Sequence, residues 1–168
     1  MVVLVAVFSS ASVLLVLSGL VKLRQPASAA GVFAELGIAV PLVEARTAVR
    51  LLGSGEVGIG LLGLVSGWSW IGALTGGLFL LFGAVTARAV RRGLSSCGCF
   101  GRASAPPSWW HVGGNVVLAV ASFVALAGDS PVEVMDAQAW SGMGFVALTG
   151  LMAGVGFALF TAGPTTRR

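Results

Sequence analysis

The chain has 168 residues, of which 57% are hydrophobic and only 10% are charged, and its formal net charge is +4. Soluble domains carry roughly a quarter charged residues, so this composition excludes an ordinary soluble enzyme and favours a lipid bilayer as the solvent. The basic residues flank apolar runs instead of forming one contiguous patch, which argues against nucleic acid as a partner.

Five apolar runs follow one another along the chain, each close to the roughly 17–25 residues that cross a bilayer. They are residues 2–21, 49–67, 68–87, 109–127 and 139–162. Backbone groups in lipid must be hydrogen-bonded within their own segment, so all five runs are predicted to be helices. We therefore expect an all-α, polytopic bundle that forms a single integral membrane domain over residues 1–168.

The first run is predicted to be a retained helix and not a cleaved signal peptide. No basic residue precedes it, it is too long for a signal peptide, and Lys22 and Arg24 follow it. Residues 25–47, between the first two runs, are too polar and too proline-bounded to cross. We expect a short amphipathic helix there, lying along the membrane surface.

The basic residues predict the orientation of the bundle. With five crossings, all ten fall on one side of the membrane, namely Lys22, Arg24, Arg46, Arg50, Arg88, Arg91, Arg92, Arg102, Arg167 and Arg168. The charged residues expected on the opposite side are all acidic, namely Asp129, Glu133 and Asp136. Because basic loops stay in the cytoplasm, we expect a plasma-membrane protein with its N-terminus outside and its C-terminus inside.

The loop of residues 88–108, between the third and fourth helices, contains both cysteines of the chain, Cys97 and Cys99. Three cations lie near them in sequence: Arg91, Arg92 and Arg102. Positive potential and the amino end of the following helix both lower a thiol pKa and raise the reactive thiolate fraction. Gly98 between the cysteines would relieve the strain of a tight disulfide ring, and such a bridge is labile. The pattern favours a redox pair.

Two other interpretations of the cysteines stay open. They could be small apolar side chains used for packing. They could also hold a soft metal ion together with His111, although three ligands at this spacing match no closed zinc pattern, and no metal site is predicted.

Two further polar residues are candidates for the site. Glu56 lies inside the second run, with Lys22 or Arg50 as a partner, and intramembrane carboxylates are either functional or held in structural ion pairs. His111 follows Trp109 and Trp110, so it fits an interfacial aromatic belt, with proton transfer near the thiols as the alternative. Three pairs of glycines are spaced for close helix packing, namely Gly63/Gly67, Gly72/Gly76 and Gly150/Gly154.

Four stretches of the chain resemble the methylamine-utilisation MauE family, a branch of the DoxX-like membrane proteins. The fairly specific one is "SSCGCFGRASAPPSWWHVGGN", with its Cys-x-Cys-Phe-Gly element. Upstream, "SGLVKLRQP", "AELGIAVP" and "LLGSGEVGIGLLGL" follow the order of that family's Gly-x-x-Lys, Gly-x-x-x-Pro and Glu-x-x-x-Gly blocks. The resemblance runs from about residue 18 to 126. Gly113 and Gly114 stand where a basic residue is expected before Asn115.

The resemblance implies a DoxX-like core of four helices, here with a further C-terminal helix, and a role in thiol–disulfide chemistry. Cys97 and Cys99 would be the redox pair. A thioredoxin-like protein would be the partner and a disulfide-rich protein the client, as in the maturation of methylamine dehydrogenase. Since the client lies outside and the cysteines are expected inside, three routes for the electrons stay open. The loop dips into the bundle and is reached from both faces, a membrane quinone or a partner protein completes the relay, or a cytosolic thioredoxin-type donor supplies the electrons. A soft-metal or small-solute carrier and a non-catalytic membrane scaffold are the alternatives.

Overall fold

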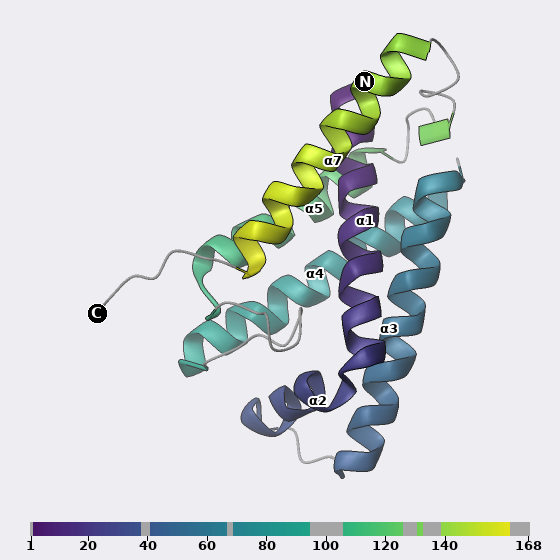
Figure 1. The fold of residues 1–168 in the computed structure, drawn as a ribbon. Coiled ribbons are helices and arrows are strands. Elements are labelled where there is room, and N and C mark those ends of the chain that lie inside the picture. The colour runs from purple at the N-terminus through teal and green to yellow at the C-terminus, as the bar shows by residue number, and fades with distance from the viewer. Residues whose placement is uncertain are drawn as a thin grey trace.

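The computed structural model describes residues 2–37, 41–66, 69–94, 106–125, 131–132 and 139–161. Throughout these ranges the chain forms helices and no strands, which confirms the predicted all-α fold (Figure 1). The helices are α1 (Val2–Arg24), α2 (Pro26–Glu35), α3 (Leu42–Val65), α4 (Ser69–Arg92), α5 (Trp109–Val124) and α7 (Ala139–Thr161).

Four helices, α1, α3, α4 and α7, are long and apolar enough to cross a membrane. The fourth predicted segment forms α5, which has 16 residues and a length of about 24 Å, shorter than the hydrocarbon core. The chain is therefore a multi-pass membrane protein, whose described residues form four long apolar helices and the shorter apolar helix α5.

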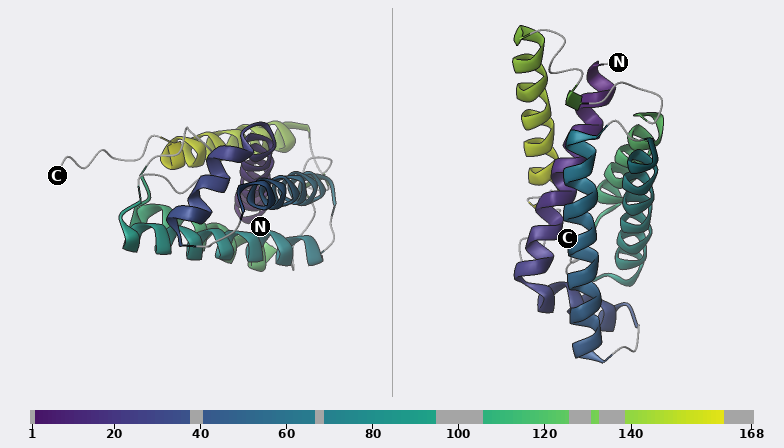
Figure 2. Two further views of the ribbon diagram at one scale, coloured as in Figure 1. Left: turned by 90° about the horizontal axis from the view of Figure 1, so that it is seen from below. Right: turned by 90° about the vertical axis from the view of Figure 1, so that its right-hand side faces the viewer.

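The helices alternate in direction along the chain. In α1 and α7, which run the same way, Ser10 hydrogen-bonds the Thr149 carbonyl, and Leu14 lies beside Gly156 further along. In α4 and α5, which are antiparallel, Gly76 faces Phe123 and Gly83 faces Asn115. The right-hand view in Figure 2 shows α7 on one side of α1 and the α4–α5 pair on the other. The central helix of the bundle is therefore α1.

Glycines bring α1 and α3 into close contact. A Cβ added to Gly19 would lie 2.5 Å from the Gly53 carbonyl oxygen, and one added to Gly60 would lie 2.6 Å from the Ser12 carbonyl oxygen. Real Cβ atoms do not approach backbone so closely, so these positions accept only glycine without a shift of the helices. The α1–α3 pair is the most tightly packed part of the membrane core.

The predicted glycine packing holds in one part of the bundle and fails in another. Gly63 lies against Ser12, and Gly76 lies against the ring of Phe123. By contrast, Gly150 and Gly154 on α7 have no atom of the described residues within 4 Å of an added Cβ. Their spacing is correct for packing, but the face of α7 that carries them is turned away from the rest of the described bundle.

The expected surface segment is divided between two helices. α2 lies across the lower end of the bundle in Figure 1, and its alanines pack against α3 in a small cluster: Ala29, Ala30, Ala45 and Val49. The last residues of the segment instead belong to α3, which begins at Leu42, earlier than the 49 expected. Pro41 is the N-cap of α3, and the polar residues that follow it extend the helix beyond its apolar part.

Two arginines of α4 fix the end of α2. Arg88 Nη2 donates to the Leu36 carbonyl at 3.3 Å, and Arg92 Nη1 donates to the Glu35 carbonyl at 3.4 Å. Cations at a helix C-terminus satisfy its free carbonyls and oppose its negative dipole end. Gly37, which follows with a positive φ of 72°, has the Arg92 guanidinium where a side chain would project. The end of α4 and the surface helix α2 therefore form one unit.

Candidate functional site

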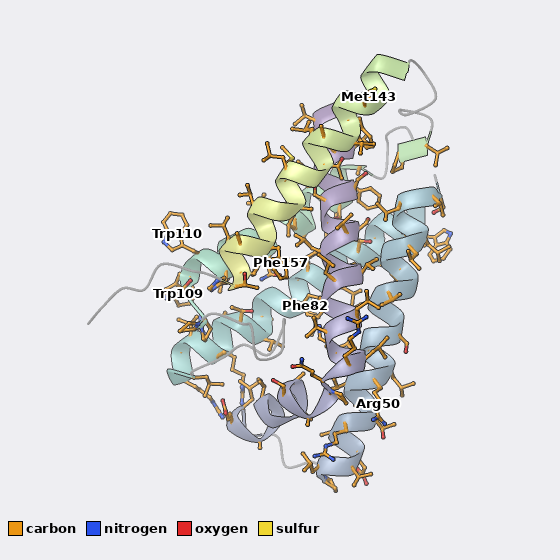
Figure 3. All side chains as sticks on the ribbon, viewed as in Figure 1. Arg50, Phe82, Trp109, Trp110, Met143 and Phe157 are labelled. Carbon is orange, nitrogen blue, oxygen red and sulfur yellow. The ribbon has the colours of Figure 1, made fainter. Side chains whose placement is uncertain are left out.

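Lys22 and Glu56 form a buried ion pair between α1 and α3. Lys22 Nζ lies 2.8 Å from both carboxylate oxygens, with its hydrogen bond directed to Oε2. The two residues are 5% and 0% exposed. The predicted partnership of Glu56 with Lys22 is confirmed, whereas Arg50 is exposed on α3 (Figure 3). Removing either partner of a charge pair sealed inside an apolar bundle would leave the other charge buried and unpaired, which is strongly destabilising.

Two further side chains complete the surroundings of Lys22. Its ammonium group donates to Ser18 Oγ at 2.6 Å, one helical turn earlier in α1. It also lies 5.0 Å from the centre of the Phe82 ring, which α4 contributes to the core. The hydroxyl accepts a hydrogen bond from the ammonium group, and the aromatic ring turns the negative face of its π-system toward it. Neither Ser18 nor Phe82 is marked by a charge or motif in the sequence, so sequence reasoning missed them.

A small cavity separates Ser18 from a second polar group, Asn115. Its volume is about 20 Å³, enough for one water molecule, and apolar side chains of α1, α4 and α7 form the rest of its wall. Asn115 is buried and donates through Nδ2 to the His111 carbonyl at 2.7 Å, within its own helix. This hydrogen bond of Asn115 therefore stays within α5.

His111 joins the beginning of α5 to the end of α7. The backbone N–H of Ser108 donates to Nδ1 at 3.0 Å, so the ring proton lies on Nε2, which donates to the Leu159 carbonyl at 3.0 Å. The ring also stacks on Phe160, with 5.5 Å between the ring centres. One imidazole thus satisfies a free donor of one helix and a free acceptor of another.

The structure gives His111 a different place from the expected interfacial belt. Its side chain is 4% exposed, while Trp109 and Trp110 beside it are 57% and 81% exposed. The neighbouring tryptophans behave as an aromatic belt should. The histidine does not, because the third helical position after Ser108 turns inward. The spacing Ser108-x-x-His111 is that of a capping box, a signal that could have identified both residues from sequence.

The described residues end on either side of the cysteine segment. α4 ends at a glycine turn, in which Gly93 has a positive φ and the Leu94 N–H donates to the Ala89 carbonyl. Arg91 in its last turn is exposed, and Arg92 is engaged with α2. Cys97, Cys99 and Arg102 lie outside the described residues. No cluster of three metal-ligating side chains occurs within the described part of the chain.

A family model described as methylamine utilisation protein MauE matches residues 1–128 of the chain. The chain belongs to the MauE family. The match covers α1 to α5 and stops before α7. No curated protein and no solved structure matches this MauE-family chain.

The geometry gives a physical role to two of the blocks that resembled the family. In the Gly-x-x-Lys block, Gly19 lets α1 approach α3, and Lys22 supplies the buried cation. In the Glu-x-x-x-Gly block, Glu56 supplies the carboxylate, and Gly60 allows the next contact on the same face of α3. The glycines and the ion pair are thus parts of one α1–α3 contact.

Proposed function

We propose that this MauE-family protein is a thiol–disulfide redox component of the plasma membrane, which supports disulfide formation in partner proteins through Cys97 and Cys99. One thiolate attacks a partner's disulfide, a mixed disulfide forms, and the second cysteine displaces the partner. Closing the Cys97–Cys99 bridge transfers two electrons to the partner, which leaves as a dithiol. The reverse sequence oxidises a client dithiol and leaves the pair reduced.

The observation that carries this proposal is that both helix ends flanking the cysteine-containing segment in the sequence are anchored. On one side, α4 ends with Arg91 and Arg92, and Arg92 is bonded to α2. On the other side, α5 begins at a capped amino end fixed by Ser108 and His111. Cations and a helix amino end raise the thiolate fraction of nearby cysteines. Family membership agrees with a role in protein maturation, although the family name alone does not assign a methylamine pathway.

The proposal includes an orientation. All seven basic residues that the structure describes lie in the last turns of α1 and α4 or the first part of α3, at one end of the bundle: Lys22, Arg24, Arg46, Arg50, Arg88, Arg91 and Arg92. The positive-inside rule makes that end cytoplasmic, with the N-terminus outside. The whole chain then acts as a single membrane domain. A thioredoxin-like partner would exchange electrons with the cysteine pair, and a disulfide-rich protein would be the client whose disulfides form.

Single and double cysteine variants test the proposal. Cys97→Ser and Cys99→Ser should each trap a mixed disulfide with a partner, because the resolving thiol is missing, and the double variant should trap none. Ser96→Ala, in the same segment, is the matched control and should behave as the unchanged protein. Client maturation at the normal rate in the double variant would instead indicate a scaffold. Stoichiometric Cu⁺ binding that needs both thiols, without any trapped partner, would indicate a carrier.

The sidedness of the pair is tested separately. A membrane-impermeant maleimide should label Cys97 and Cys99 in inverted vesicles and not in intact cells. Labelling only from outside would contradict the proposed orientation while leaving the redox role intact.

A further inference from the structure

A groove of about 630 Å³ opens between α5 and α7. Its walls are formed by one face of α5, from Trp110 to Val117, and by Leu159 and Phe160 near the end of α7. The two helices lie on opposite sides of α1 (Figure 2), and among the described residues His111 links the start of α5 to the last turns of α7. A volume of 300–1,000 Å³ is usual for sites that hold small organic molecules.

The lining of the groove suits a flat, apolar molecule. Gly113 and Gly114 leave part of the α5 wall without side chains, and no atom of the described residues lies within 4 Å of a Cβ added to Gly113. The stacked rings of His111 and Phe160 form an aromatic wall. Trp110, 81% exposed, adds an indole N–H donor, and Figure 3 shows it standing out from the start of α5.

One end of the groove lies toward the basic end of the bundle, and the other lies deeper along α5. Trp110 lies at the first turn of α5, on the same side of the bundle as the arginines that end α4. Val117 lies seven residues further, which places it about 10 Å deeper along the helix axis. An amphipathic ligand would therefore place its polar ring near the interface and direct its tail toward the hydrocarbon.

We propose that this groove binds the ring of a membrane quinone. Quinones combine the required features, namely a flat ring with carbonyl acceptors, and an apolar tail. The proposal rests on the redox role proposed above, because that role needs an electron acceptor in the membrane. A dithiol that closes to a disulfide releases two electrons and two protons, and one quinone takes up both to become a quinol. The groove begins 11 residues after Cys99 in the sequence, at Trp110.

Photolabelling of the full-length protein in lipid nanodiscs tests the site. An azido-substituted short-chain ubiquinone should label peptides of α5 and of the last turns of α7, and excess unlabelled ubiquinone should prevent this. Gly113→Leu fills the groove at a position where the side chain meets no described atom, and should reduce the competable labelling about tenfold or more, in line with overpacking penalties. Gly77→Leu, at an equally open, exposed position of α4, is the matched control and should label normally.

The outcomes separate this site from the function proposed for the cysteines. The Cys97→Ser/Cys99→Ser variant should label like the unchanged protein, because the proposed ring contacts come from the described lining residues of α5 and α7. Undiminished labelling in Gly113→Leu, or labelling that phospholipid competes away as well as ubiquinone does, would overturn the quinone site and leave thiol exchange standing. Normal labelling with no quinol formed by the reduced protein would uphold the site and contradict the electron route through the cysteines.

Discussion

The α1–α3 contact and the α5–α7 contact are built from similar apolar, glycine-containing helices, yet they are opposites in packing. Along α1 and α3, glycines meet backbone atoms, and the approach encloses the Lys22–Glu56 pair. Between α5 and α7, one histidine and one aromatic stack hold the helices, and a groove remains open beside them.

The difference shows what glycine does in this membrane protein. Where both helices present small residues at matching heights, the backbones touch, and charged side chains can be enclosed with their partners. Gly150 and Gly154 on α7 have the same spacing but no matching surface among the described residues. The first arrangement is suited to rigidity and the second to admitting a ligand.

Breaking the buried ion pair should have the largest effect. Glu56→Gln or Lys22→Met should each lower the free energy of unfolding by about 3–5 kcal/mol, because the remaining partner is left buried and unpaired. The double variant Lys22→Met/Glu56→Met should recover much of that loss. Denaturation with SDS in mixed micelles, followed by circular dichroism, measures all three. If the double variant is as unstable as the sum of the single variants, the two side chains are not energetically coupled.

Adding one methyl group should distinguish the two contacts directly. Gly60→Ala should lower the free energy of unfolding by about 1–3 kcal/mol, since the new Cβ would collide with the Ser12 carbonyl. Gly154→Ala, on the open face of α7, should be neutral or stabilise by up to about 1 kcal/mol, from its higher helix propensity. The same SDS titration compares them. Equal losses in both variants would mean that α7 packs as tightly as α3.

Removing the link between α5 and α7 should have the smallest and most local effect. His111→Ala leaves the Ser108 amide and the Leu159 carbonyl without their partner, and the loss of such a cap lowers stability by about 0.5–2 kcal/mol. Hydrogen exchange should therefore speed up in the last turns of α7 and the first turn of α5. Exchange in the α1–α3 contact should stay unchanged, and acceleration there would show that the two regions unfold together.

Much of the fold could be predicted from the sequence, because hydropathy and segment length alone require helices in lipid. The start of α3 could not, since residues 42–48 are polar enough to resemble a loop and are helical all the same. For the site, a carboxylate inside an apolar run was enough to identify Glu56 as a candidate residue. The nearby basic residues limited its possible partners to Lys22 and Arg50. The packing of α1 against α3 makes Lys22 the partner, because Lys22 and Gly19 lie on the same face of α1 and both contact Gly53 of α3.

His111 shows the opposite case, in which sequence context pointed the wrong way. Its tryptophan neighbours suggested the interface, but successive helical residues point in directions about 100° apart. Only the position of α7 decided that the histidine would face a carbonyl at the end of that helix.

By itself, the sequence determined that this protein is a helical membrane protein, that its basic residues flank its apolar segments, and that its two cysteines are separated by one residue. These are properties of local composition, because hydropathy, charge and length act within each segment of the chain. The tertiary structure alone decided which charge is paired, which glycines are crowded, and where a groove remains. Those outcomes depend on the approach of helices distant in sequence, and no single segment contains that information.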